Sequence, residues 1–133
     1  MKYSRITLNM PKNSEKLPFI GSFPLLRAMM EKNNYDGLPG ECLVDENGDV
    51  VAIGVVDPDG YSLYAKLCVF EVREDLRRNG LGKRLLTDIV NKYDEVKLVA
   101  MRPAYEFYRN CGFTFCEGCP DPRVNVAYMY SII

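Results

Sequence analysis

The sequence contains no histidine and no tryptophan among its 133 residues. The absence of histidine excludes catalysis by a Cys–His pair and any metal site that needs an imidazole ligand. No apolar run approaches the roughly 20 residues of a membrane-spanning helix, and the N-terminus has no signal-peptide stretch. We therefore expect a cytoplasmic protein without membrane contact.

A surplus of positive charge is also missing, because 17 Lys and Arg residues stand against 18 Asp and Glu residues. This balance gives no indication of binding to nucleic acid or to an anionic membrane. Hydrophobic residues make up 47% of the chain and charged residues 26%, which is ordinary for a globular protein. The length suits a single domain over residues 1–133 with one core.

The five cysteines are an odd number, which argues against a complete disulfide framework. Cys42 and Cys68 lie in apolar segments, where a free thiol behaves as a small hydrophobic side chain. Cys111, Cys116 and Cys119 have the spacing C-x4-C-x2-C, which raises the possibility of zinc. Without histidine, the fourth ligand would have to be a carboxylate or a distant cysteine. We therefore favour reduced thiols and predict no metal site.

The periodicity of apolar residues predicts an α/β domain with a mixed sheet. Asn47-Gly48 between two apolar runs indicates a hairpin, and residues 57–60 (DPDG) indicate a second turn. Ser22 is a plausible cap for the first helix. Helices are expected over residues 24–33, 81–93 and 104–111, and strands over residues 3–10, 41–44, 50–56, 61–72, 96–101, 113–116 and 124–132.

The stretch from Val72 to Leu86 is the most informative part of the chain. Here a strand ends, a glycine-containing turn follows, and an amphipathic helix begins. The free N–H groups and the dipole at such a helix start attract phosphate oxygens. Gly80 and Gly82 remove side chains that would keep a pyrophosphate off the backbone, while the alternative is an ordinary tight turn with a solvated basic face.

Two common phosphate-binding motifs do not fit this turn. In a Walker loop, the dipeptide Gly82-Lys83 would be followed by serine or threonine, but Arg84 follows it. A dinucleotide-binding G-x-G-x-x-G motif that begins at Gly80 would need glycine where the chain has Leu85. Both motifs are therefore excluded.

The turn does resemble the Q/R-x-x-G-x-G/A signature of the GNAT family, the Gcn5-related N-acetyltransferases, through Arg77-Arg78-Asn79-Gly80-Leu81-Gly82. A second element of that family, A-x-x-F-Y-x-x-x-G-F, is matched by residues 104–113 (AYEFYRNCGF). The similarity is specific between residues 70 and 113 and diffuse before residue 60. It implies a mixed, mostly antiparallel central sheet with helices on both faces, and an N-acetyltransferase that uses acetyl-coenzyme A.

The resemblance also implies a role for individual residues. The backbone around Phe70 and Val72 would bind the pantetheine arm at an opened strand edge. The pyrophosphate would be held by the turn, whose residues are Arg77, Arg78, Asn79, Gly80, Leu81, Gly82 and Lys83. Tyr108 would stand near the sulfur and protonate the leaving thiolate, although an aromatic side chain on a short helix is often simply part of the core. The amine would attack the thioester directly, with the cysteines as bystanders.

The general base and the acceptor are less well defined. Glu71 is a candidate base because it adjoins the cofactor edge. Two positions depart from common family patterns: Lys66 stands where some members have glutamate, and Met101 where many have asparagine. The acceptor is an unidentified amine, either a small molecule, a protein N-terminus or a lysine side chain. A non-catalytic module that binds acetyl-coenzyme A is the main alternative, followed by a purely structural protein. Acyl-chain length and oligomeric state are left open.

Overall fold

The computed structural model of the chain describes residues 2–61, 63–116 and 126–131. In chain order, its helices and strands are β1 (Ser4–Asn9), α1 (Pro24–Lys32), β2 (Pro39–Val44), β3 (Val50–Tyr61), β4 (Tyr64–Val72), α2 (Leu81–Tyr93), β5 (Val96–Met101), α3 (Tyr105–Asn110), β6 (Phe113–Phe115) and β7 (Val126–Ser131). Short 3-10 turns precede α1, α2 and α3. In the part of the chain described, no helix is long and apolar enough to cross a membrane.

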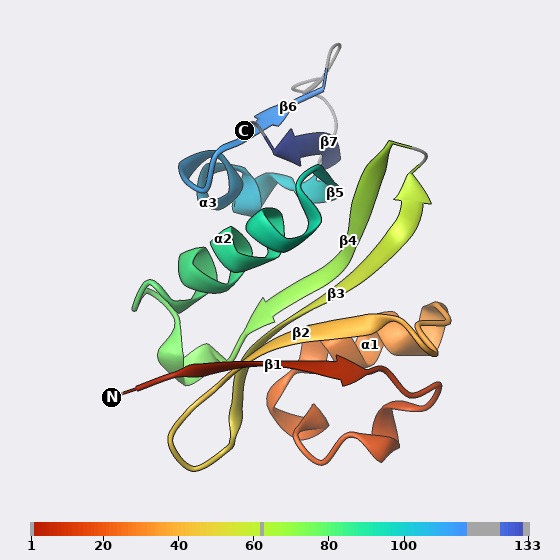
Figure 1. Ribbon diagram of the computed structural model, residues 1–133, viewed down its shortest axis with the longest axis vertical. Helices are drawn as coiled ribbons and strands as arrows, with labels where there is room; N and C mark the ends of the chain where they lie inside the picture. Colours follow the sequence, from red (N-terminus) through yellow and green to blue (C-terminus); the bar gives the residue numbers. More distant parts are fainter. Residues whose placement is uncertain (1, 62, 117–125, 132–133) are drawn as a thin grey trace.

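The strands form one sheet in the order β1-β2-β3-β4-β5-β7-β6. Every neighbouring pair is antiparallel except β4 and β5, which are parallel. Helix α1 lies behind the β2–β4 part of the sheet in Figure 1, whereas α2 lies in front of it. The predicted mixed, mostly antiparallel sheet with helices on both faces is therefore confirmed.

Two groups of buried side chains fill the space between the helices and the sheet. On one face, Leu85, Leu86 and Ile89 of α2 are fully buried against the strands. On the other face, Leu26 and Met30 of α1 pack against β2, β3 and β4. Each helix therefore buries one apolar stripe, as its 3.6-residue periodicity predicts.

Strands β4 and β5 separate soon after they meet. Their ladder contains only two pairs, Ala65 with Val96 and Lys66 with Lys97. Beyond Lys66, β4 continues to Val72 while pairing only with β3. The N–H and C=O groups that β4 would otherwise give to β5 therefore face an open gap between the two strands.

A β-bulge in β4 sets which side chains enter that gap. Val55 and Val56 are consecutive in β3, but they pair with Val69 and Leu67, so Cys68 is an extra residue in β4. A bulge of this kind reverses the alternation of side chains beyond it. As a result Glu71, whose direction the sequence pattern left open, points toward α1.

Two local expectations are wrong. Residues 57–60 do not form a turn, because β3 runs on to Tyr61, which pairs with Tyr64. The segment is an irregularity in the ladder instead, and a Cβ at Gly60 would come within 2.4 Å of the Lys66 Cβ. Ser22 does not cap α1, since the helix begins after Phe23 without a side-chain cap at that position. The ends of the last predicted strand, residues 124–125 and 132, lie outside the described residues.

Candidate active site

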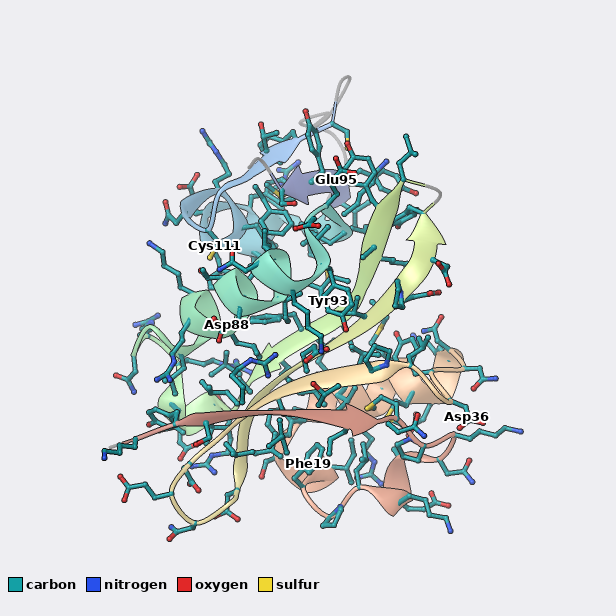
Figure 2. The ribbon with its side chains drawn as sticks, viewed as in Figure 1. Phe19, Asp36, Asp88, Tyr93, Glu95 and Cys111 are labelled. Atoms are coloured by element: carbon teal, nitrogen blue, oxygen red, sulfur yellow. The ribbon has the colours of Figure 1, made fainter. Side chains whose placement is uncertain are left out.

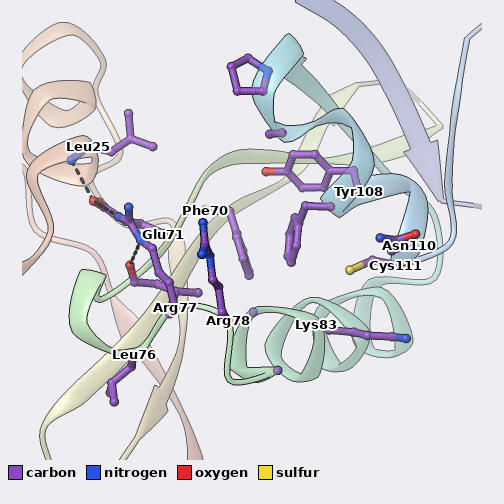
Figure 3. A pocket seen from close by; sticks show the side chains of 16 residues that line it. Leu25, Phe70, Glu71, Leu76, Arg77, Arg78, Lys83, Tyr108, Asn110 and Cys111 are labelled. Atoms are coloured by element: carbon purple, nitrogen blue, oxygen red, sulfur yellow. Dashed lines mark hydrogen bonds and ion pairs between the residues drawn. The ribbon is translucent and has the colours of Figure 1, made fainter.

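A cavity of about 740 Å³ opens where β4 ends and α2 begins (Figure 3). One wall is β4, through Phe70, Glu71 and Val72. The turn before α2 and the first residues of α2 form the floor, and α3 forms the opposite wall with Phe107 and Tyr108. The cavity therefore lies against the part of β4 that has separated from β5.

The start of α2 gives this cavity a set of free hydrogen-bond donors. Gly80 is the N-cap residue and has a positive φ of 77°, a conformation that favours glycine. Its lack of a side chain leaves the first-turn amides uncapped, and the first helical bond runs from Arg84 N to Gly80 O. The positive end of the helix dipole and these amides together suit an anionic group such as a pyrophosphate.

The two arginines of the turn are arranged differently. Arg78 adopts a positive φ of 69°, which is uncommon for a residue other than glycine, and its side chain extends into the cavity (Figure 3). Arg77 folds back over β4, where its Nε donates to Val72 O at 3.0 Å. Together with Lys83 they give the floor of the cavity a positive charge.

Gly82 allows α2 to approach α3 closely. A Cβ at this position would lie 3.1 Å from two ring atoms of Phe107 and 3.3 Å from Val72 Cγ2. The Phe107 ring in turn stacks on Phe70, with ring centroids 5.9 Å apart. The second glycine of the motif is therefore explained by helix packing as well as by space for a ligand.

Tyr108 lies on α3 with its hydroxyl group directed toward the cavity (Figure 3). Its ring is held edge-on against Phe107 and Phe113, at centroid distances of 5.2 and 5.8 Å. Burial is the main cause that raises the pKa of Tyr108 to about 12, and the nearby Cys111 thiol adds to it. The phenol is therefore fully protonated at neutral pH.

Glu71 is a buried carboxylate with backbone partners. Its exposed fraction is 4%, and its two oxygens accept hydrogen bonds from Leu25 N at 3.1 Å and Leu26 N at 2.8 Å. These amides belong to the first turn of α1, so Glu71 caps that helix from a distant strand. Arg77 Nη2 lies 3.8 Å from Glu71 Oε2 and links the cap to the turn before α2.

A second cavity, of about 460 Å³, lies on the α1 side of the gap between β4 and β5. Both cavities are lined by Leu25, Phe70, Ala104 and Tyr108, so they meet at these residues. The second cavity extends along β4 to Lys66 and along β5 to Val99 and Met101. A ligand in each cavity would therefore have one end near the Tyr108 ring.

Most of the predicted site residues lie together. Nine of them line the first cavity, while Asn79 does not and the Leu81 side chain is buried in the core. Leu25 could not be predicted from the sequence, because nothing local connects α1 to a site on β4. Ala104 and Phe107 also line the cavity without a predicted role, although both belong to the second family motif. The predicted residues that line the cavity are Phe70, Glu71, Val72, Arg77, Arg78, Gly80, Gly82, Lys83 and Tyr108.

The four cysteines that the structure describes show no grouping that suggests metal. Within residues 2–61, 63–116 and 126–131, no cluster of three potential ligands is found, and Cys119 lies outside these ranges. Burial raises the pKa of the Cys42 thiol to about 12 and is also the main cause that raises the pKa of Cys111. Thiols of this kind are poor nucleophiles at neutral pH.

Comparisons with solved structures agree on the fold. An acetyltransferase of the GNAT family from Staphylococcus aureus Mu50 superposes with a TM-score of 0.67 at 17% identity, covering 98% of each chain. Escherichia coli ElaA gives a TM-score of 0.68 at 16% identity, covering 98% of this chain and all of the other. A Bacillus anthracis protein assigned as a streptothricin acetyltransferase, in complex with acetyl-coenzyme A, gives 0.59 at 18% identity, over 72% of this chain and 62% of the other.

Comparison with curated proteins finds no match. The model of the acetyltransferase (GNAT) domain, in contrast, matches residues 39–115, which include the separated strand, the turn before α2 and all of α3. This match spans more than half of the chain and confirms the family that the two motifs indicated, with its acyl-coenzyme A-dependent N-acetyltransferase activity and acetyl-coenzyme A as co-substrate. The chain belongs to the GNAT family of acetyltransferases.

Proposed function

We propose that this enzyme transfers the acetyl group of acetyl-coenzyme A to a primary amine by direct attack, at the point where the two cavities meet. The observation that carries the proposal is the shared boundary of the cavities at Phe70 and Tyr108. A cofactor in the 740 Å³ cavity and an acceptor in the 460 Å³ cavity would meet there without any covalent enzyme intermediate.

The first cavity suits the pyrophosphate and the pantetheine arm of coenzyme A. The pyrophosphate would bind the amides at the start of α2, with Arg78 and Lys83 adding positive charge. The pantetheine arm would then run along the free edge of β4 and take up backbone hydrogen bonds near Phe70 and Val72. The thioester would arrive beside Tyr108, since this residue lines the far end of the same cavity.

The chemistry at the junction needs few groups. A neutral amine nitrogen attacks the thioester carbonyl carbon, the C–S bond breaks, and the sulfur leaves with the bonding electrons. Tyr108 donates its proton to the departing sulfur, which a phenol that is fully protonated at neutral pH can do. Backbone N–H groups at the separated edge of β4 would stabilise the oxyanion. The phenolate then recovers a proton lost by the acetylated nitrogen.

An amine that arrives as an ammonium ion must first lose a proton to become the neutral nucleophile, and Glu71 stays the candidate base for that earlier step. Among the described residues it is the one carboxylate that lines the first cavity. Both of its oxygens already accept an amide hydrogen, but a carboxylate offers about four acceptor positions, so lone pairs remain for a water molecule. We therefore propose that Glu71 would act through water rather than by direct contact with the amine.

Cofactor binding is tested by thermal unfolding with and without acetyl-coenzyme A. Ligand at about a hundred times its dissociation constant adds roughly 2.7 kcal/mol to the free energy of unfolding. We expect the midpoint to rise by several degrees for the natural sequence, and not to rise for Gly80→Glu. Gly80→Ala is the matched control, because it shares the cost of positive φ at this position without the negative charge.

The role of Tyr108 is tested by thiol release in Tyr108→Phe. Loss of a general acid typically reduces turnover by about 10² to 10⁴-fold, while the retained ring preserves the packing against Phe107 and Phe113. Acetyl-coenzyme A affinity should stay within about twofold of the parent value. Unchanged turnover would remove the acid role, and binding without thiol release across a broad amine panel would instead identify a non-catalytic cofactor-binding module.

A further inference from the structure

Two lysines stand side by side at the closed end of the gap between β4 and β5. Lys66 and Lys97 are partners in the last pair of the β4–β5 ladder before the strands separate. Both ammonium groups lie against the same ring, with Nζ atoms 5.6 and 5.3 Å from the Tyr61 centroid. Like charges in adjacent ladder positions destabilise a sheet, so such a pair calls for a compensating anion.

Among the residues that the structure describes, the surrounding side chains do not supply that anion in full. In the described part of the chain, neither lysine forms an ion pair within 4.0 Å. Asp57 on β3 is the ladder partner of Lys66, and this single carboxylate compensates at most one of the two charges. Lys97 otherwise faces tyrosine rings, at 5.3 Å from Tyr128 and 6.0 Å from Tyr64.

The second cavity begins at Lys66, next to Lys97 rather than lined by it, and most of its lining is apolar. Lys66 is the one charged residue among those described that line it, and the polar remainder is Asn33, Tyr35, Cys68 and Tyr108. Val99 and Met101 line the cavity and lie on a face of β5 and β7 that no described helix covers. Their side chains are 47% and 62% exposed, so an apolar ligand would remove a substantial area from water there.

We propose that the acceptor is an amine on an apolar body that also carries a carboxylate or another anionic group, which binds between Lys66 and Lys97. The inference rests on the proposed function, because the amine must reach Tyr108 at the other end of the cavity. Lys66 and Phe70 are four residues apart on β4, a distance of roughly 13 Å. The anionic group therefore lies about that far from the reacting nitrogen, and polycationic amines are poor acceptors.

A binding measurement tests this proposal independently of turnover. The probe is the N-acetylated tetrapeptide leucyl-alanyl-leucyl-alanine, whose extended chain spans roughly 13 Å. Its dissociation constant is measured by calorimetry beside that of its C-terminal amide and of N-acetylspermine. We expect the free carboxylate to bind about tenfold more tightly than the amide, the ratio that one charge-assisted contact supports, and N-acetylspermine to bind most weakly.

Two variants and a control complete the experiment. Lys66→Met and Lys97→Met should each reduce the ratio between carboxylate and amide toward one. Lys16→Met makes the same change at an exposed position outside both cavities and should keep the ratio. Equal affinities for the carboxylate and the amide, or tighter binding of N-acetylspermine, would overturn the proposal. A retained preference in a protein that releases no thiol would uphold the anion site while removing the transferase reaction.

Discussion

The sheet buries two glutamates, one on each face, and holds them in different ways. Glu41 of β2 is fully buried on the α2 side, where side chains of β1 and α2 surround it. Glu71 of β4 is 4% exposed on the α1 side and accepts hydrogen bonds from backbone amides. Figure 2 places Tyr93, one of the partners of Glu41, over the sheet at the end of α2.

The partners explain the two roles. Glu41 pairs with Arg5 at 2.9 Å and with Lys92 at 2.8 Å, and it also accepts hydrogen bonds from Thr7 and Tyr93. Through these contacts Glu41 links β1 and the end of α2 to β2, away from both cavities. Glu71 instead fixes the start of α1, whose Leu25 lines both cavities. The first glutamate therefore joins parts of the fold away from the cavities, whereas the second holds a helix start whose Leu25 lines both of them.

The largest expected effect is that of Glu41→Gln. The substitution leaves Arg5 and Lys92 without their carboxylate, and breaking such a buried pair costs about 3 kcal/mol. Urea unfolding should show this loss in the free energy of unfolding, whereas Glu15→Gln, an exposed control, should change it by less than about 0.5 kcal/mol. Acetyl-coenzyme A affinity, measured well below the unfolding midpoint, should be the same in all three proteins.

Lowering the pH should also reduce the free energy of unfolding, because it protonates Glu41. Burial alone would raise the pKa of Glu41, but hydrogen bonds from Lys92, Tyr93, Thr7 and Arg5 outweigh it and lower the pKa to about 2. Because the folded-state pKa lies below the ordinary value of 4.5, the stabilisation is complete above pH 4.5 and is lost as pH falls toward 2. The loss amounts to about 3 kcal/mol.

This acid dependence is checked by urea unfolding at several pH values between 6 and 2. The contribution of Glu41 should be missing from Glu41→Gln, so the stability difference between the two proteins should shrink as pH falls. A difference that stays constant across this range would show that the carboxylate is not held in its charged form.

Glu71→Gln should cost less stability but more activity. The glutamine side-chain oxygen can replace one of the two carboxylate acceptors. Its NH2 group, however, would face a backbone N–H donor of α1, so one hydrogen bond is lost. Loss of a hydrogen bond to a charged group lowers the free energy of unfolding by about 2 kcal/mol. Because Leu25 moves with the start of α1, we expect the KM for the amine to rise. If Glu71 is also the base, kcat falls as well, which steady-state kinetics separates from the change in KM.

Most of the fold and part of the site can be predicted from the sequence. The helix at Leu81–Tyr93 follows from its apolar stripe, and the turn before it follows from two glycines and the basic residues around it. The direction of Glu71 could not be predicted, because the bulge at Cys68 depends on ladder pairing between distant strands. The same holds for the Lys66–Lys97 pair, since 31 positions separate the two residues in sequence and only the sheet brings them together.

The smallest expected effect is that of Arg77→Met on stability. Its ion pair with Glu71 is 3.8 Å long and its side chain is 51% exposed, so the loss should stay below about 1 kcal/mol. Lys92→Met is the counterpart on the other face, where a 2.8 Å bond to fully buried Glu41 is removed, and it should cost about 2 kcal/mol. Equal losses in urea unfolding would mean that the Arg77 guanidinium neutralises Glu71 as strongly as Lys92 neutralises Glu41. In that case the helix amides alone would not hold the second carboxylate, and the distinction between the two glutamates would be one of position only.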